Sequence, residues 1–464
     1  MEKRPRQLEA MSKKLSLFDS TTIIMGSMIG SGIFIVSASI AQQVKSPGLL
    51  IGAWVLTAII TMLGALSYGE LAAMYPQAGG QYVYLREAYG KRTAFLYGWS
   101  LFSVIQTGTI AAVGMAFAKF LGVFWDDCSS TNIIIDLGFK EISLQQLVAI
   151  ASIVALTLVN YRGVKNSALV QNIFTVAKIL ALVIVVLAGL FIGMNGIGDW
   201  GNFSPAWPDV FTWGTLGVFG AAMTGSLFSA DAWNNITYTA GEVENPKRNL
   251  PLSLALGTGS VLLIYILVNI MYVYVMPITE IANAPQERVG TAFMQKLLGD
   301  SGQYWMAGLI MLSTFGCLNG LIFTAPRAYM AMAKDGLFFK KAANLTSDGV
   351  PKYGLTIQML WSGLLCLSGQ YNQLLDFLII VVLIFYILTV GGLFILRKKK
   401  PEMERPYKAV GYPFLPALYI ILAIWVSINI IVNQTENSLY GIGIMLLGLP
   451  IYYFFHSKSK NSDA

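Results

Sequence analysis

Charged, metal-binding and disulfide-forming side chains are scarce in this chain of 464 residues. Only 12% of the residues are charged, about half of the share found in soluble domains. There is one histidine, and the three cysteines, Cys128, Cys317 and Cys366, lie far apart in the sequence. These residues supply neither a set of zinc ligands nor a disulfide framework. The sequence therefore gives no support to a metalloenzyme or a small secreted domain, and we expect no enzymatic activity and no cofactor.

Apolar residues, in contrast, make up 55% of the chain. They come in blocks of about 20, the length that a helix needs to cross a hydrocarbon core of about 30 Å, and short polar segments separate the blocks. Helices are the expected spanning element because each satisfies its own backbone hydrogen bonds. We therefore predict an all-α polytopic membrane protein of one domain, with about twelve transmembrane helices. The predicted spans are residues 18–44, 48–74, 91–123, 142–160, 166–193, 214–241, 251–276, 303–333, 354–370, 373–396, 412–433 and 438–456.

The basic residues are sorted between the two sides of these spans. The formal net charge is +7, and 25 of the 31 Lys and Arg residues fall in alternate segments, beginning with residues 1–17 and ending with 457–464. By the positive-inside rule, both termini are expected to be cytoplasmic tails of an integral protein of the plasma (inner) membrane. The basic run at 397–400 is interpreted as a contact with lipid headgroups. Lipid is therefore an expected partner, and nucleic acid is not.

Residues 26–32, in the middle of the first span, carry three glycines. Each glycine costs a helix about 1 kcal/mol relative to alanine, so we expect the helix to open there. Unwound backbone at this depth is tolerated only where it is buried in protein or lines a cavity. The alternative is that the small residues allow close packing against a neighbouring helix.

A second interruption is predicted in the sixth span, at residues 228–235. This segment places Asp231 and two amide side chains in the bilayer, where an ionisable group is costly and is normally paired or next to a polar pathway. Broken helices at matching positions of two halves point to the central site of a transporter. We therefore expect a transport core at 18–396 made of two inverted five-helix repeats, about 18–193 and 214–396, followed by helices 11 and 12 at 397–456.

The two breaks suit the head group of an amino acid. A half-helix that begins after Gly32 presents free N–H groups and the positive end of its dipole, which favours a carboxylate. Half-helices that end near Ile29 and Phe228 leave carbonyls at their negative ends, which favours an ammonium group. We expect these main-chain groups to bind the constant part of an α-amino acid.

These segments are similar to motifs of the amino acid, polyamine and organocation superfamily, and within it of the L-amino acid transporter branch. The matching segments are GSMIGSGIF at 26–34, GEL at 69–71, YP at 75–76, GGQY at 79–82, NYRGVK at 160–165, ENP at 244–246 and RNLP at 248–251. The resemblance is clear up to about residue 340 and rests on pattern in the last four helices. It implies a LeuT-like fold in which Gly30, Ser31 and Gly32 contact the substrate carboxylate.

The resemblance also assigns roles in the sixth span. Phe228 matches the residue that closes over bound substrate, and Trp233 and Asn234 match the rest of this motif. Ser229 and Asp231 are expected near the substrate ammonium, together with the carbonyls of the breaks. Asp231 departs from the eukaryotic members, which carry glycine there. Two interpretations remain open for it: a bond to a cationic substrate side chain, or a place in a structural polar network.

Two further ionisable residues lie within predicted spans, Lys178 and Glu70. The segment around Lys178 resembles the fifth-helix region in which a lysine takes the place of the sodium ion of sodium-coupled relatives, with Ser313 and Thr314 as hydroxyl partners. Because the pKa of a buried lysine changes readily, Lys178 is also a candidate proton carrier. Glu70 is interpreted as a hydrogen-bonded structural acid, with a role in a cytoplasmic gate as the alternative.

These features predict a secondary active amino acid transporter that works by alternating access, in which spans 1, 2, 6 and 7 rock against spans 3, 4, 8 and 9. The expected activity is sodium-independent exchange of neutral L-amino acids. The alternatives are a proton-coupled permease, a permease for cationic amino acids or polyamines, and an amino acid sensor that does not transport. Eukaryotic members of this branch often pair with a glycoprotein through a loop cysteine. Cys128 lies in the comparable loop, but we expect no partner subunit.

Overall fold

The computed structural model describes residues 15–138, 141–368 and 371–460. The α-helices are α1 (Leu17–Met28), α2 (Gly32–Val44), α3 (Pro47–Met74), α4 (Gln81–Tyr89), α5 (Lys91–Ser100), α6 (Gln106–Leu121), α7 (Leu144–Asn160), α8 (Val164–Phe191), α9 (Trp213–Ser229), α10 (Pro246–Val275), α11 (Ile278–Ala282), α12 (Val289–Leu298), α13 (Asp300–Thr324), α14 (Pro326–Lys334), α15 (Lys352–Ser368), α16 (Tyr371–Lys399), α17 (Phe414–Asn433) and α18 (Thr435–Lys460). A π-helix, η2 (Leu101–Ile105), joins α5 to α6. The 3₁₀ helices are η3 (Gly193–Asn195), η4 (Trp200–Phe203), η5 (Trp233–Glu242), η6 (Pro285–Glu287) and η7 (Lys340–Ala343).

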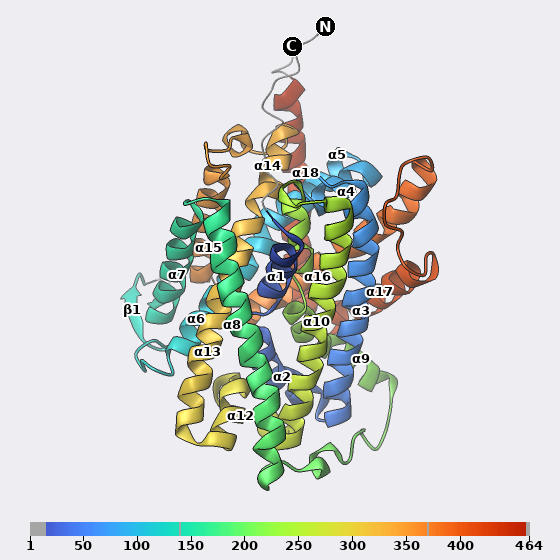
Figure 1. The fold of residues 1–464 in the computed structure, drawn as a ribbon. Coiled ribbons are helices and arrows are strands. Elements are labelled where there is room, and N and C mark those ends of the chain that lie inside the picture. Colours follow the sequence, from blue (N-terminus) through green and yellow to red (C-terminus); the bar gives the residue numbers. More distant parts are fainter. Residues whose placement is uncertain (1–14, 139–140, 369–370, 461–464) are drawn as a thin grey trace.

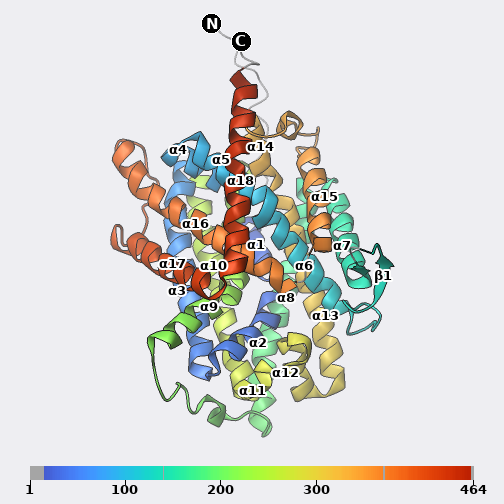
Figure 2. The same cartoon turned by 180° about the vertical axis from the view of Figure 1, so that it is seen from behind.

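The long helices form a bundle whose two ends differ (Figure 1, Figure 2). Helices α4, α5 and α14 gather at one end, and α11 and α12 lie at the other. We call these the α4 end and the α12 end. A short antiparallel hairpin of β1 (Ile133–Asp136) and β2 (Glu141–Ser143) stands at the side of the bundle, between α6 and α7. It is the only sheet among the described residues, so the all-α prediction is confirmed apart from this unforeseen hairpin.

Helical segments occur at all twelve predicted spans. Within the described part of the chain, nine segments are long and apolar enough to cross a membrane. The spans that fall short of that length are α7, α9 and α15, each of 17 residues. Helix α9 is continued by η5, so the complete sixth span is longer than α9 alone.

The helices at the rim of the bundle expose large apolar side chains. Leu180 and Phe191 on α8, Ile421 and Ile428 on α17, and Leu447 on α18 are all exposed. Broad apolar surface of this kind marks a membrane-facing protein. The described residues thus form an integral, multi-pass membrane protein.

The packing follows the symmetry expected of two inverted repeats. Spans that correspond in the two halves pack against each other: α3 against α10, α6 against α13, and α7 against α15. Likewise, α1 packs against α8 as α9 packs against α16. A two-fold axis in the membrane plane brings corresponding elements together in this way. The limits of the repeats, about 18–193 and 214–396, remain a prediction.

The basic run at 397–400 contacts protein. Arg397 binds both carboxylate oxygens of the buried Glu70, at 2.6 and 2.9 Å. Lys399 donates to the carbonyl of Ala88, and Lys400 pairs with Glu87 at 2.7 Å. Three of the four cations of this run thus have protein partners, although Lys399 is exposed, and the interpretation of the run as a lipid-headgroup contact stays a prediction.

Glu70 is a structural acid, as predicted. Besides Arg397, it is paired with Arg405 at 3.3 Å and accepts the backbone N–H of Ala409 at 2.7 Å. Its carboxylate therefore ties α3 to the linker between α16 and α17. We call Glu70 and its three partners the α3 brace.

Candidate functional site

The first span is broken in the middle of the molecule. Helix α1 ends at Met28, Ile29 has an extended backbone (φ −76°, ψ 92°), and α2 begins at Gly32. The first of the three glycines lies within α1, before the break. A Cβ on Gly26 would lie 2.0 Å from the Gln171 amide nitrogen, so this glycine permits close packing of α1 on α8. Both predicted interpretations thus apply, because close packing at Gly26 precedes the opening at residues 29–31.

The carbonyls at the end of α1 bind the ammonium group of Lys178. This side chain reaches from α8, is fully buried, and donates to the carbonyls of Gly26 at 2.7 Å and Ile29 at 2.8 Å. The negative end of the α1 dipole faces the same charge. Carbonyl oxygens around a compact cation form the environment that also suits Na⁺. The structure thus brings Lys178 to the first break.

Two other helices supply hydroxyl and thiol donors to the same turn. Ser313 on α13 lies 3.3 Å from the carbonyls of both Ile29 and Gly30, and Cys317, one turn later, donates to Ser27 at 3.0 Å. Tyr265 on α10 donates to Met28 at 3.0 Å. Thr314 is not brought to Lys178, since its hydroxyl bonds to Ile310 and Met311 in its own helix.

The sixth span is broken where predicted. Helix α9 ends at Ser229, Ala232 adopts a left-handed backbone (φ 67°), and the chain continues as the 3₁₀ helix η5. The two breaks touch. A Cβ on Gly32 would lie 2.0 Å from the Ser229 hydroxyl oxygen and 3.1 Å from its Cα, so no side chain fits between α2 and α9.

Asp231 lies at the second break, bonded to a tyrosine. Tyr386 on α16 donates to its carboxylate at 2.5 Å. Trp233 packs edge-on against Tyr68, with ring centroids 4.7 Å apart. Two small cavities, of about 20 and 10 Å³, lie beside Asp231. Each has space for about one water molecule. The bond to Tyr386 fits a polar network around Asp231, and both interpretations of its role remain predictions.

The remaining predicted residues are held by neighbours. Asn234 donates to Gln81 at 2.9 Å, which links η5 to α4. Phe228 is buried, and its carbonyl accepts the N–H of Asp231 at 3.1 Å. The Ser229 hydroxyl bonds to Gly225 in its own helix. The structure therefore brings the two breaks, Lys178, Ser313 and Asp231 to the middle of the bundle.

Two broken helices that meet inside a membrane bundle, with their free ends facing a common centre, are typical of the binding sites of secondary transporters. A sequence model of amino acid permeases matches residues 15–450 of this chain. The chain belongs to the amino acid permease family.

The permease is similar over nearly its whole length to characterised transporters. It is 29% identical to the b(0,+)-type amino acid transporter 1 of Mus musculus, over 96% of this chain and 88% of that protein. It is 28% identical to the serine/threonine exchanger SteT of Bacillus subtilis, over 96% and 97%. It is 31% identical to the large neutral amino acids transporter small subunit 2 of Mus musculus, over 96% and 81%. The family consists of transporters, so the permease is not an enzyme.

Polar contacts join helices of the permease at the α4 end. Arg327 on α14 and Glu242 at the end of η5 form a buried ion pair at 2.7 Å. Asn172 on α8 donates to Asp19 on α1 at 2.6 Å. We call the Glu242–Arg327 pair the inner lock, because the sequence predicts that this end faces the cytoplasm. It joins the second half of the broken sixth span to the eighth span.

Other polar contacts join elements at the α12 end. Lys119 on α6 pairs with Glu287 at 3.6 Å, and Arg288 donates to the backbone carbonyl of Lys119. We call these two contacts the outer lock. They tie α6 to the loop that follows α10 and α11.

Sequence reasoning did not find several residues of the site. Tyr265 and Cys317 are absent from the predicted set, although Cys317 lies four residues after Ser313 and therefore on the same helical face. That spacing was the available signal. Tyr386 and Arg327 gave no such signal, because their partners lie 155 and 85 positions away.

Proposed function

We propose that this permease is a secondary active transporter that exchanges neutral L-amino acids by alternating access and without sodium. The observation that carries the proposal is the ammonium group of Lys178 among the carbonyls of the first break. A fixed cation at this position satisfies the end of α1 permanently. No sodium ion is then needed to join α1 to α8 and α13.

The substrate head group is bound, in this proposal, between the two breaks. The N-terminal amides around Gly30, Ser31 and Gly32 bind the carboxylate, because the first turn of α2 has N–H groups without intrahelical acceptors. The Ile29 carbonyl already accepts from the ammonium group of Lys178 at 2.8 Å, and the Ser313 hydroxyl lies 3.3 Å from it. The cation of Lys178 beside Ile29 would repel a second ammonium group, so we assign the substrate ammonium to the end of α9, at the carbonyls of Phe228 and Ser229, of which the Phe228 oxygen already accepts the N–H of Asp231.

The hydrogen bond between Asp231 and Tyr386 favours neutral substrates. Its carboxylate accepts a short hydrogen bond from Tyr386 inside the bundle, so it is engaged by the protein and not aimed at a substrate side chain. The substrate site between the two breaks is lined or gated, in this proposal, by Phe228, Trp233 and Asn234. Two relatives bear names that fit this proposal: one is a serine/threonine exchanger, and the other a transporter of large neutral amino acids.

We further propose that the α4 end faces the cytoplasm, with both termini on that side of the plasma membrane. Most basic residues flank the spans at this end, as the positive-inside rule requires. The α12 end then faces outward.

A partner subunit linked by a disulfide is not part of the proposal. Cys128 is buried, and its thiol points to the carbonyl of Ala118 at 3.4 Å. Burial raises the pKa of this thiol, which lowers its reactivity. One relative is named as a small subunit, so non-covalent assembly is the form that a partner would take.

Exchange in reconstituted vesicles tests the proposal. The vesicles contain unlabelled amino acid, and the outside solution contains a trace of one labelled amino acid. Neutral, cationic and acidic amino acids are tested in turn. We expect uptake of neutral amino acids that requires amino acid on the opposite side and is unchanged when choline replaces sodium. Uptake driven by sodium or by a pH gradient alone would overturn the exchange mechanism. Intact binding without flux would identify a sensor.

A further inference from the structure

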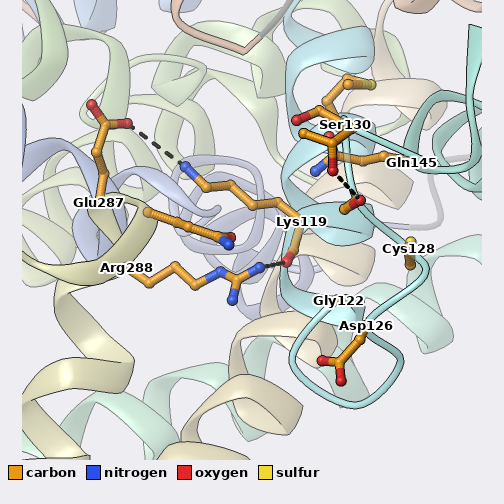
Figure 3. A pocket seen from close by; sticks show the side chains of 12 residues that line it. Lys119, Gly122, Asp126, Cys128, Ser130, Gln145, Glu287 and Arg288 are labelled. Carbon is orange, nitrogen blue, oxygen red and sulfur yellow. Dashed lines mark hydrogen bonds and ion pairs between the residues drawn. The ribbon is translucent and has the colours of Figure 1, made fainter. Parts of the chain in front are cut away.

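A polar cavity of about 330 Å³ lies beside the outer lock, away from the two breaks. Its walls come from the end of α6, the loop that follows it, the start of α7, and the loop before α12 (Figure 3). Besides charged residues, it is lined by Ser129, Ser130, Thr131, Gln145 and Gln286. Nothing in the proposed exchange mechanism uses this space.

The charges around the cavity are balanced. Lys119 and Arg288 are cations, and Asp126 and Glu287 are anions. Lys119 and Glu287 pair with each other. Arg288 and Asp126 form no ion pair with any residue that the structure describes, and the Nε atom of Arg288 is buried without a hydrogen-bond partner. One cation and one anion are thus left to act on a ligand.

The wall that carries Arg288 has a strained backbone. Gln286 and Glu287 are consecutive, are not glycine, and have φ of 51° and 61°. Residues held in such conformations cluster at binding and switch regions. A neighbouring glycine also matters: a Cβ on Gly122 would lie 2.6 Å from the Cys128 carbonyl and 3.4 Å from an Arg288 nitrogen. The backbone is thereby held close to the guanidinium.

We propose that this cavity is a second amino acid binding site, at the α12 end, which takes the zwitterionic head group before it reaches the breaks. Arg288 binds the carboxylate, in the bidentate geometry that guanidinium groups favour. Asp126 binds the ammonium, and the hydroxyl and amide groups face the side chain. A ligand of one charge sign would leave either Arg288 or Asp126 without a counter-charge, whereas a zwitterion serves both. The inference rests on the proposed function, since it assumes amino acid substrates.

The site is coupled to the outer lock through one residue. Arg288 donates to the Lys119 carbonyl in the structure, and a substrate carboxylate competes for the same guanidinium. Binding therefore weakens one of the two contacts that tie α6 to the loop before α12. An amino acid arriving from outside would in this way help to open the end that it enters.

The test is the binding stoichiometry of labelled L-serine and L-leucine to purified protein in nanodiscs. We expect two amino acids per chain for the unmodified protein. Arg288→Gln and Asp126→Asn should each reduce the stoichiometry to one amino acid per chain. Ser31→Trp, which fills the site between the two breaks, should also reduce it to one. The matched control is Asp127→Asn, which changes an adjacent exposed acid that does not line the cavity and should leave two.

Exchange kinetics provide a second readout. In vesicles, Asp126→Asn should raise KM for amino acid supplied at the α12 end about tenfold, with the maximal rate and the KM at the α4 end unchanged. One bound amino acid per unmodified chain, with normal exchange, would overturn this inference and leave the proposed function standing. Neither binding nor exchange would overturn both. Because Asp126 is exposed and makes no ion pair, its replacement keeps the test decisive even if Arg288→Gln does not fold.

Discussion

At the scale of single residues, the first break is stabilised by side-chain donors that replace the missing helical ones. Five carbonyls at residues 26–30 would otherwise face a protein interior without partners, at a cost of about 1–3 kcal/mol each. Lys178, Ser313, Cys317 and Tyr265 satisfy all five between them. Side chains of three neighbouring helices, α8, α10 and α13, therefore stabilise the break.

Lys178→Ala should cripple exchange without removing the protein from the membrane. The Gly26 and Ile29 carbonyls would lose a charged donor, and we expect the initial rate to fall at least about tenfold, equivalent to 1.4 kcal/mol in the barrier. High sodium should restore part of the rate, because Na⁺ suits the vacated oxygens. Uptake is measured at matched protein yield, with the exposed Lys340→Ala as control. Full activity of Lys178→Ala would remove the lysine from the mechanism.

Gly32→Ala should abolish exchange for a steric reason. Its Cβ would overlap the Ser229 hydroxyl, so α2 and α9 would be pushed apart at the substrate site. Adding Ser229→Gly should recover part of the activity, since it removes the overlapping atoms. Gly443→Ala on α18, where a Cβ meets nothing within 4 Å, is the control. A normal rate for Gly32→Ala would show that the breaks do not meet during the cycle.

At the scale of elements, the α3 brace joins α3 to the end of α16 and to the linker that leads to the last two helices. Removing one partner of a buried ion pair leaves an uncompensated charge, which costs about 3–5 kcal/mol. We therefore expect Glu70→Ala to lower the thermal unfolding midpoint by about 3–5 °C. Glu404→Ala, which removes an exposed pair with Lys247, should change it little. Equal midpoints for the two variants would contradict the brace.

The sequence predicts the positions of the helices more completely than it predicts which side chains contact each other. Spans and breaks follow from local features: apolar length, the glycines at 26–32, and the polar residues at 228–235. The form of η5 does not, because tertiary contacts such as the Asn234–Gln81 bond hold it as a 3₁₀ helix. Ser313 and Thr314 were both predicted as hydroxyl partners of Lys178. Only the structure shows that Ser313 lies next to the Ile29 carbonyl that Lys178 binds, whereas Thr314 bonds within its own helix. Similarly, the partners of residues 397–400 lie more than 300 positions away in the chain.

At the scale of the whole molecule, locks at both ends surround a tightly packed centre. The inner lock is buried, whereas the outer lock has a longer ion pair, 3.6 Å against 2.7 Å. Both must break in turn if access alternates. Because each lock joins different spans, each can open while the other stays closed.

Glu242→Gln should shift the molecule toward opening at the α4 end. The buried Arg327 would lose its counter-charge, and the inner lock would weaken. We expect faster maleimide labelling of a cysteine introduced by Asn235→Cys, a buried position that lines one of the two small cavities beside Asp231. Glu244→Gln, an exposed acid two residues away, is the control. Unchanged labelling in Glu242→Gln would show that the ion pair does not gate this end.

The engagement of residues 397–400 by the protein has a consequence for the membrane in which the permease works. Clusters of basic residues next to a span commonly respond to the surface potential of anionic lipids. Here Arg397, Lys399 and Lys400 already have protein partners. Bilayers with very different contents of acidic phospholipid should therefore support similar turnover, and the carrier should keep its rate as the composition of its host membrane changes.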